Sequence, residues 1–391
     1  MNPTDIIAPL HGDLPASDDW LMSLKTPCYV YDPSVVLARF AALRQRLATS
    51  LIVSLKANPN LDLLIRCGHA FVDGIELASQ GELDLVAGRI HAPKYVNNPS
   101  MDEPFMRAAL ASRCIFIIDS LEQAQRLIQV VGQQPPPQTV LRLNACELVG
   151  MEAHLADHFG MSRHDVLLTA KALAHAHIPV MGLHVFAGSH HFRLDNSGAD
   201  AADLAHALAA FAPKVAHVTG KPITFLNLGG GFTEHSDSQE ATFDTYRQRL
   251  ASLLPSFTLA HESGRAIFAS AGTFVTRIRA VKVLGERYVA ICDGGLSHNF
   301  LLARTESLLK KYAQPRLLRQ RKASADDQQR PIQFVGSTCS RADVIGWQHQ
   351  ACAAPDAGDL VIFENCGAYH QSYSVSGFLS HKPAHSYIHQ S

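Results

Sequence analysis

The sequence lacks a large excess of charge of either sign. Its 34 lysine and arginine residues nearly balance 35 aspartate and glutamate residues, which gives a net charge of −1 at pH 7. Nucleic acids and anionic membranes attract strongly basic proteins, so neither is expected as a partner. The chain has no apolar run near the ~18 residues that cross a bilayer, and residues 1–5 show no signal-peptide pattern. We therefore expect a protein of the cytoplasm.

Cysteine pairs at short spacing are also absent. The eight cysteines form no Cys-x-x-Cys pair, which in a chain of 391 residues favours reduced, mostly buried thiols over a disulfide framework. The histidines do not combine with cysteines or carboxylates at the spacing of a metal site, so no metal is expected. A chain of this length can bury one large core or two ordinary ones.

Short apolar runs alternate with helical patterns along the first two thirds of the chain. Strand alternating with helix eight times predicts an α/β fold of the (β/α)8 TIM-barrel type. Beyond residue 268 such runs follow one another without long helices, which predicts a mostly β domain. We place the barrel at 28–267 and the β-rich domain at 1–27 together with 268–391. The eight barrel runs are 51–55, 72–77, 95–97, 115–118, 139–143, 181–186, 223–228 and 258–261.

Lys56 stands at the end of the first of these runs and precedes a loop that contains Asn58 and Pro59. A lysine at the exit of a buried strand is costly to desolvate, and desolvation favours the neutral amine that attacks an aldehyde. The simpler alternative is a lysine whose stem lies along the strand while its charge reaches water. The residues at the other strand ends favour the chemical interpretation.

Polar or glycine-rich groups stand at the ends of six of the eight predicted strands, where barrels of this type place their chemistry. Glycines 229–231 follow the seventh strand and Gly264-Arg265 follows the eighth, so backbone N–H groups can approach an anion there. A glycine run alone is equally compatible with a flexible turn, but these two loops are the usual phosphate site of the fold. A lysine that seeks an aldehyde, a phosphate cradle and the carboxylate of Glu262 suggest pyridoxal 5'-phosphate, whose ring nitrogen needs an anionic partner. A salt bridge with Arg265 is the alternative role of Glu262.

A set of short motifs follows in a fixed order along nearly the whole chain. They are Thr26-Pro27-Cys28-Tyr29-Val30-Tyr31-Asp32, Lys56-Ala57-Asn58-Pro59, Ser79-Gln80-Gly81-Glu82-Leu83, His158-Phe159-Gly160-Met161, Gly229-Gly230-Gly231, Glu262-Ser263-Gly264-Arg265, Asp293-Gly294-Gly295, Gly336-Ser337-Thr338-Cys339 and Gly367-Ala368-Tyr369. In this order they resemble the fold-type III pyridoxal-phosphate decarboxylases, the group of ornithine, arginine and diaminopimelate decarboxylases, which are related in fold to alanine racemase. Among these, the chain is most similar to a branch that works in siderophore and other secondary metabolism.

The resemblance implies a carboxy-lyase in which Lys56 is joined covalently to the cofactor and Glu262 pairs with its pyridine nitrogen. Cys339 is implied to protonate the carbanion left by CO2, from the β-rich domain and across a homodimer interface. Arg142 is implied to lie near the ring hydroxyl. The full set of cofactor-binding residues expected on this basis is Lys56, Glu76, Arg142, His184, Phe186, Ser189, Gly230, Gly231, Glu262, Gly264, Arg265 and Tyr369.

Two departures from the family pattern bear on the ring face and the substrate. Phe186 stands where members often carry a histidine, and it can cover the ring face but cannot donate a proton. After Cys339, Ser340 and Arg341 replace the acidic residue that binds the distal ammonium in diamine-forming members, and a hydroxyl followed by a cation is a poor ammonium partner. We therefore expect a carboxylate-bearing or acyl-linked amino acid, conjugated to citrate or tethered to a carrier protein. Candidate substrate contacts are Ser340, Arg341 and His190.

Three other functions stay open at this point. The first is a decarboxylase of a free amino acid such as diaminopimelate or ornithine, and the second is an amino-acid racemase on the same scaffold. A racemase needs a second base opposite Lys56, usually a tyrosine, whereas Cys339 matches the decarboxylase pattern. The third is a regulatory homologue without activity, which the presence of Lys56, Glu262 and Cys339 together disfavours.

Overall fold

The computed structural model describes residues 18–149, 158–186, 188, 192, 200–234, 240–304, 312–321 and 328–389. The chain divides into two compact units. One is Leu37–Ile267, and the other combines Met1–Val36 with Phe268–Ser391. Among the helices in these described ranges, none is both long and apolar enough to cross a membrane.

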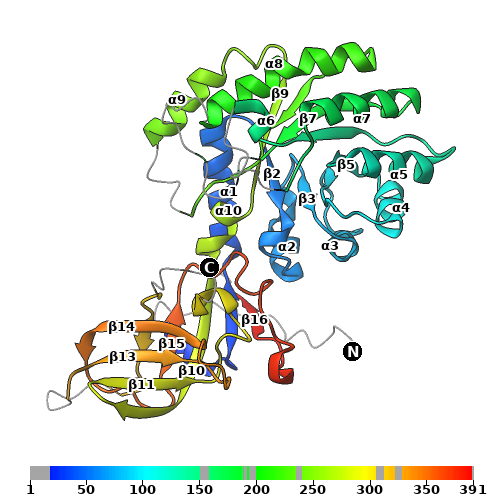
Figure 1. Ribbon diagram of the computed structural model, residues 1–391. Coiled ribbons are helices and arrows are strands. Elements are labelled where there is room, and N and C mark those ends of the chain that lie inside the picture. The colour runs from blue at the N-terminus through cyan, green and yellow to red at the C-terminus, as the bar shows by residue number, and fades with distance from the viewer. Residues whose placement is uncertain are drawn as a thin grey trace. The chain divides into compact units, whose positions relative to one another are not determined.

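The unit of residues 37–267 is a closed barrel of parallel strands surrounded by helices (Figure 1). Each strand pairs with the next one along the chain, and β9 closes the barrel by pairing with β2, where Ile52 aligns with Glu262. This arrangement confirms the predicted (β/α)8 barrel. The strands are β2 (Ser50–Ser54), β3 (Ile75–Leu77), β4 (Lys94–Val96), β5 (Ile115–Ile118), β6 (Thr139–Leu143), β7 (Val180–Val185), β8 (Phe225–Asn227) and β9 (Thr258–Ser263).

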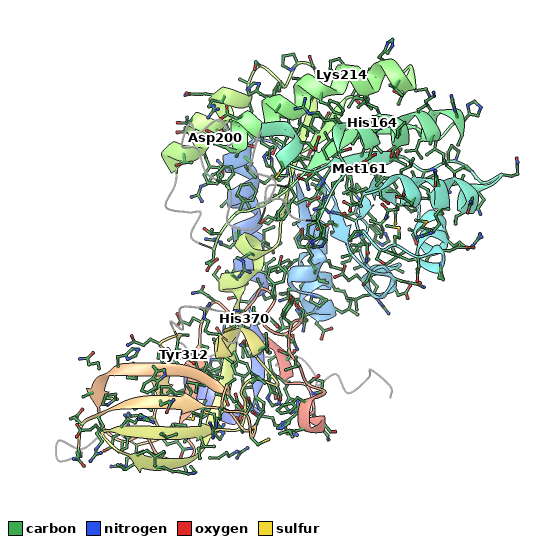
Figure 2. All side chains as sticks on the ribbon, in the orientation of Figure 1. Met161, His164, Asp200, Lys214, Tyr312 and His370 are labelled. Atoms are coloured by element: carbon green, nitrogen blue, oxygen red, sulfur yellow. The ribbon has the colours of Figure 1, made fainter. Side chains whose placement is uncertain are left out.

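Side-chain caps begin many of the helices. Ser120 and Ser162 each accept a hydrogen bond from the amide three residues ahead, which satisfies a donor of the first turn. Asp200, labelled in Figure 2, caps α8 and also accepts a hydrogen bond from Arg249 of α9. The helices are α1 (Pro33–Leu47), α2 (Leu61–Cys67), α3 (Gln80–Val86), α4 (Glu103–Ala111), α5 (Leu121–Val131), α6 (Cys146–Val149), α7 (Arg163–His175), α8 (Ala201–Thr219), α9 (Glu240–Leu250) and α10 (Arg265–Phe268), with short 3-10 turns such as η2 (Leu55–Ala57).

An apolar layer fills the inside of the barrel. Gly182 of β7 lies against this layer, and a Cβ atom there would stand 2.4 Å from the carbonyl oxygen of Phe225, so only glycine permits the close approach of β7 to β8. The barrel is therefore a packed core, as in other barrels of this type, and not a pore. The buried residues of the layer are Ile52, Tyr95, Ile117, Val140, Phe225 and Ala260.

The second unit is an eight-stranded sheet in the order β12-β15-β10-β11-β13-β14, with β1 joined to β10 and β16. Figure 1 shows the long β10 and its partner β11, which stand in the middle of this order. Cys28, Val275 and Ile362 lie in its apolar core. The strands are β1 (Cys28–Tyr31), β10 (Gly272–Leu284), β11 (Arg287–Cys292), β12 (Arg316–Leu318), β13 (Arg330–Val335), β14 (Val344–Cys352), β15 (Leu360–Phe363) and β16 (His385–Ile388).

Residues 28–36 lie in the sheet unit, whereas the sequence analysis assigned them to the barrel. The reason is the pairing of β1, in which Cys28 aligns with Val275 of β10 and with His385 of β16. The barrel begins only at β2, after α1. Asp32 accepts a hydrogen bond from the amide of Ser34 (2.8 Å) and so caps α1.

Candidate active site

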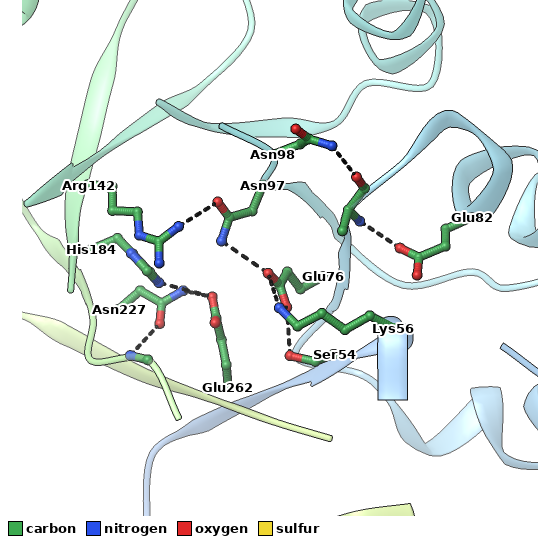
Figure 3. A network of polar contacts seen from close by, with 12 residues as sticks. Ser54, Lys56, Glu76, Glu82, Asn97, Asn98, Arg142, His184, Asn227 and Glu262 are labelled. Atoms are coloured by element: carbon green, nitrogen blue, oxygen red, sulfur yellow. Dashed lines mark hydrogen bonds and ion pairs between the residues drawn. The ribbon is translucent and has the colours of Figure 1, made fainter. Parts of the chain in front are cut away.

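A layer of buried polar side chains lies next to the apolar layer of the barrel. Figure 3 shows the network of polar contacts that most of these side chains form. Side chains two residues apart on a strand share a face, so Ser54, Asn97 and Glu262 point inward like Ile52, Tyr95 and Ala260. The polar layer therefore stands at the carboxyl ends of the strands, where barrels of this type place their chemistry. Each of the eight barrel strands contributes one member at its end or just after it: Ser54, Glu76, Asn97, Asp119, Arg142, His184, Asn227 and Glu262.

Lys56 reaches this layer through Glu76. Lys56 Nζ donates hydrogen bonds to both carboxylate oxygens of Glu76 at 3.0 Å. Ser54 Oγ (2.6 Å) and Asn97 Nδ2 (3.0 Å) also donate to the Glu76 carboxylate, which is almost fully buried. These donors fix the carboxylate, and the carboxylate in turn fixes the position of the amine.

The sequence predicts that burial removes water from the Lys56 amine, but the structure shows a side chain that is not buried. Its side chain is 45% exposed, because the residue lies in the short η2 turn that follows β2 and not within the strand. The ion pair with Glu76 holds the amine in this position when nothing else is bound. A group that binds Lys56 must therefore compete with Glu76 for it.

Arg142 connects the polar layer to the segment that follows β6. Its Nη1 lies 3.4 Å from Asn97 Oδ1 and 3.5 Å from Asp119 Oδ1, and its guanidinium stands 4.5 Å from the ring centre of Phe159. Asp119 Oδ1 also accepts a hydrogen bond from the amide of Gly160 (2.8 Å). The Phe159-Gly160 motif thus helps to hold a buried cation in place. Among the described residues, Arg142 Nε has no hydrogen-bond partner.

Glu262 lies in the same polar layer, in contact with Asn227 and His184. Its Oε1 accepts a hydrogen bond from Asn227 Nδ2 (2.8 Å) and lies 3.3 Å from His184 Nε2. Burial by itself raises the pKa of Glu262, but the charge and contact of His184, with Lys56 and Asn227, hold that pKa well below its usual value. The site therefore presents an ionised carboxylate at the carboxyl ends of the barrel strands. His184 is fully buried, and neither of its ring nitrogens makes a hydrogen bond within the described part of the chain.

The glycine-rich loops after β8 and β9 pack closely against neighbouring residues of the barrel. A Cβ at Gly230 would stand 2.6 Å from the carbonyl oxygen of Glu262, and one at Gly264 would stand 2.5 Å from Ala57 Cβ. Gly229 has a φ of +66° and donates its amide to Asn227 Oδ1 (3.0 Å). Such loops can turn several backbone N–H groups toward one anion, which is how phosphate groups are held in barrels.

The structure brings together the predicted residues Lys56, Glu76, Arg142, His184 and Glu262. Phe186 follows β7 and is partly buried. Ser189 and His190 lie outside the described residues. Four further predicted residues lie on the sheet unit: Cys339 and Arg341, which are exposed, and Ser340 and Tyr369, which are partly buried.

Sequence reasoning missed four members of the polar layer, which are Ser54, Asn97, Asp119 and Asn227. Each stands two residues after an inward-facing apolar residue, so strand periodicity could have identified them once the inward face was known. They carry no charge pattern or motif that marks them along the chain. Only the closure of the barrel places them beside Lys56 and Glu262.

His261 lies on the opposite face of β9 from Glu262. Its Nδ1 shares a hydrogen bond with Thr49 Oγ1 (2.8 Å) and its Nε2 with Tyr246 OH (2.9 Å). Burial lowers the pKa of His261 from 6.5 to about 3, against a small opposing effect of Glu262. The neutral ring thus ties the strand that carries Glu262 to α9.

A pH-dependent contribution of His261 to stability should follow. Because its pKa is lower in the folded state, the unfolded chain binds more protons, and the stabilisation is present above about pH 6.5 and is lost as the pH falls below that value. The difference in melting temperature between the protein and a His261→Gln variant should be a few degrees at pH 7.5 and should shrink by pH 5. His175→Gln, at an exposed helix end, is the control. A difference that does not change with pH would contradict the assignment.

A family model described as pyridoxal-dependent decarboxylase, C-terminal sheet domain, matches residues 28–367. The chain therefore belongs to the pyridoxal-dependent decarboxylases, and it is a pyridoxal-phosphate-dependent amino-acid decarboxylase. This confirms the class of enzyme and the cofactor that the motifs imply.

Several characterised relatives align over most of their lengths. A diaminopimelate decarboxylase of Deinococcus radiodurans is 28% identical over 94% of this chain and 92% of its own. An L-glutamyl–BtrI acyl-carrier-protein decarboxylase of Niallia circulans is 27% identical over 91% of this chain and 87% of its own. A 2-((L-alanin-3-ylcarbamoyl)methyl)-2-hydroxybutanedioate decarboxylase of Staphylococcus aureus is 26% identical over 84% of each chain.

The polar layer and the glycine loops fit pyridoxal phosphate. The ionised Glu262 suits a protonated ring nitrogen, and its Oε1 is already held by Asn227 and His184. Close packing against neighbouring residues leaves no room for a Cβ at Gly230 or Gly264. Glycine loops after these two strands can present backbone N–H groups to a phosphate. Lys56 offers an amine at the same end of the barrel. A carboxylate, an amine and two glycine loops are thus available for the ring nitrogen, the aldehyde and the phosphate of the cofactor.

Proposed function

We propose that this decarboxylase acts on an amino acid joined to a carboxylate-bearing group, either conjugated to citrate or tethered to a carrier protein, in siderophore or other secondary-metabolite biosynthesis. The observation that carries the proposal is the charge of the loop after Cys339. Arg341 is exposed there, and Ser340 Oγ accepts a hydrogen bond from the amide of Ala342 (3.2 Å). The next acidic residue, Asp343, is buried and accepts three hydrogen bonds, so it offers nothing to a substrate ammonium.

A guanidinium in this loop favours a carboxylate over a second ammonium at the far end of the substrate. The names of two relatives support the same choice. One acts on a glutamyl group carried by an acyl-carrier protein, and the other on an alanyl unit joined through a carbamoyl group to hydroxybutanedioate. Both substrates present acyl or carboxylate groups without a second ammonium. Ornithine presents an ammonium alone at its far end, and diaminopimelate presents an ammonium beside a carboxylate.

In this proposal the barrel binds the cofactor and the sheet unit supplies an acid. Lys56 holds the cofactor aldehyde, Glu262 pairs with the pyridine nitrogen, and Arg142 lies near the ring hydroxyl. Glu76 orients Lys56, and His184 orients Glu262. Phe186 covers the ring face. The phosphate is held by Gly230, Gly231, Gly264 and Arg265, with Ser189 and Tyr369 as further contacts.

The cofactor, when bound, supplies an electron sink for the pair released as CO2 leaves. Glu262 stabilises the positive charge of the ring nitrogen that makes the sink effective. Cys339 Sγ donates the proton that replaces the carboxyl group on the α-carbon. The active enzyme is a homodimer in which Cys339 reaches the barrel of the partner subunit.

A substrate screen followed by CO2 release tests this function. It includes 2-((L-alanin-3-ylcarbamoyl)methyl)-2-hydroxybutanedioate, a carrier-bound L-glutamyl group, meso-diaminopimelate and L-ornithine. We expect release from one of the first two compounds at a higher kcat/KM than from either diamino acid. Preference for a diamino acid would refute the substrate assignment. Loss of optical rotation without CO2 would instead indicate a racemase.

The charge of the loop gives a prediction about specificity. Ser340→Asp should raise kcat/KM for meso-diaminopimelate about tenfold relative to the preferred substrate, because a charge-assisted hydrogen bond to an ammonium becomes available. The Asp side chain can still accept from Ala342, so the turn is kept. The asparagine side chain of Ser340→Asn has the shape of aspartate without its charge. This variant should leave the ratio of the two kcat/KM values, for meso-diaminopimelate and for the preferred substrate, near that of the unchanged enzyme. Equal effects of the two variants would show that charge at this position does not select the substrate.

A further inference from the structure

The loop between β13 and β14 carries three of the residues proposed to act on the substrate. We call residues 336–343 the cysteine loop. Its ends are joined by a hydrogen bond from the amide of Gly336 to the carbonyl oxygen of Asp343 (2.9 Å), and the amide of Asp343 donates to the carbonyl oxygen of Ser340 (3.1 Å). Asp343 therefore closes the loop through its backbone on both sides.

The carboxylate of Asp343 also turns inward beneath the loop. Its Oδ1 accepts a hydrogen bond from the amide of Leu296 (2.7 Å). Its Oδ2 accepts from the amide of Thr338 (2.9 Å) and from Thr338 Oγ1 (2.7 Å). The residue is only 3% exposed. A buried carboxylate held by neutral donors depends on all of them, because an unsatisfied buried charge is costly.

Two glycines make room for this carboxylate. A Cβ at Gly336 would stand 2.3 Å from Asp343 Oδ1, and one at Gly295 would stand 2.4 Å from the same oxygen. The Cβ at Gly295 would also stand 2.4 Å from Gly336 Cα, so the two backbone segments are in direct contact. The glycines belong to separate motifs, Asp293-Gly294-Gly295 and Gly336-Ser337-Thr338-Cys339, which are thus joined around one side chain.

Cys339 itself is exposed. Its position is therefore set by the loop on either side of it and not by burial of its own side chain. Thr338, which precedes it, is held by Asp343, and Ser340, which follows it, donates its amide to Thr338 Oγ1 (3.3 Å). The hydrogen bonds that fix both neighbours of the thiol lead to the same carboxylate.

We propose that Asp343 is a positioning residue of the decarboxylase, which holds the cysteine loop so that Cys339 Sγ delivers its proton to the α-carbon from one direction. The inference rests on the proposed function of Cys339. Asp343 does not touch the substrate and acts through Thr338 and the loop backbone. Gly295 and Gly336 serve the same arrangement by admitting the carboxylate.

Hydrogen exchange of the complete cofactor-loaded enzyme tests the positioning directly. In Asp343→Asn an NH2 group, which cannot accept a hydrogen bond, replaces one of the two accepting oxygens. Exchange of the backbone amide hydrogens of Leu296 and of the cysteine loop should therefore quicken at least about tenfold. Thr338→Val removes one donor and should act in the same direction at less risk to folding, while Thr338→Ser keeps the hydroxyl and should restore slow exchange. The matched control is Asp359→Asn. Asp359 is a fully buried carboxylate in the same unit, and it accepts from the amides of Gln320 and Asp356.

Turnover of the preferred substrate of the screen gives the second measurement. Asp343→Asn should lower kcat about tenfold with little change in KM. It should also increase the fraction of product protonated at the wrong carbon, which is the effect that we expect of Cys339→Ala as well. Asp359→Asn should change neither kcat nor the fraction of wrongly protonated product. Unchanged exchange in the cysteine loop overturns the inference, and so does faster exchange with normal kcat when Cys339→Ala is impaired. If Cys339→Ala is itself fully active, the proposed role of Cys339 fails, and the catalytic part of the inference fails with it.

Discussion

Replacing Lys56 with alanine should lower kcat by more than about 1000-fold, because the amine is proposed to hold the cofactor covalently. Borohydride treatment of the unchanged protein should fix the cofactor to the peptide that contains Lys56, and the variant should give no such product by mass spectrometry. The side chain of Lys56 is 45% exposed, and Glu76 keeps its bonds from Ser54 and Asn97 in the variant. The fold should therefore survive the change.

The control for this result is Lys214→Ala. Lys214, labelled in Figure 2, is an exposed lysine of α8. Its loss should leave both kcat and the borohydride product unchanged. Residual activity of Lys56→Ala above a thousandth of the original rate, or a reduced product on another lysine, would mean that the amine has been assigned to the wrong residue.

Glu262→Gln should lower kcat by about 100-fold to 1000-fold while the protein still binds pyridoxal phosphate. The glutamine keeps an acceptor for Asn227 Nδ2, so the local packing is preserved, but the negative charge opposite the ring nitrogen is lost. The bound cofactor then becomes a weaker electron sink. The visible absorbance of the bound cofactor and kcat, measured together, separate this effect from loss of the cofactor.

The low pKa of Glu262 sets the pH range of its effect. Because that pKa is lower in the folded state than in the unfolded chain, the ionised carboxylate contributes stability that is present above its usual pKa and lost as the pH falls below it. Turnover should therefore show no loss from protonation of Glu262 between pH 5 and pH 8. Glu103→Gln, at an exposed ion pair on α4, is the surface control. If Glu262→Gln is as active as that control, the carboxylate does not serve the ring nitrogen.

Much of the site could be predicted because its residues recur at the ends of successive strands. Lys56, Arg142, His184 and Glu262 stand at strand ends, and parallel strands of a closed barrel bring those ends to one edge. Ser54, Asn97, Asp119 and Asn227 were not predicted, since a neutral or acidic residue at the end of a short strand, or just after it, resembles any loop residue. Their role depends on which face of each strand points inward.

The exposure of Lys56 and the position of β1 could not be read from local pattern either. A lysine after an apolar run is buried or exposed according to where the strand stops, and β2 ends at Ser54. Residues 28–31 have the composition of a buried strand in either unit. Only their pairing with β10 and β16 decides that they belong to the sheet.

The sequence by itself determined the barrel, the class of enzyme and its cofactor, because periodicity and ordered motifs are local properties of the chain. Tertiary structure alone decided how the charges are connected: that Glu76 receives Lys56, that His184 and Asn227 hold Glu262, and that Asp343 lies beneath the cysteine loop. These contacts join residues from different strands and loops. Hydrogen bonds and ion pairs depend on distances of a few ångströms, which the spacing of residues along a chain does not specify.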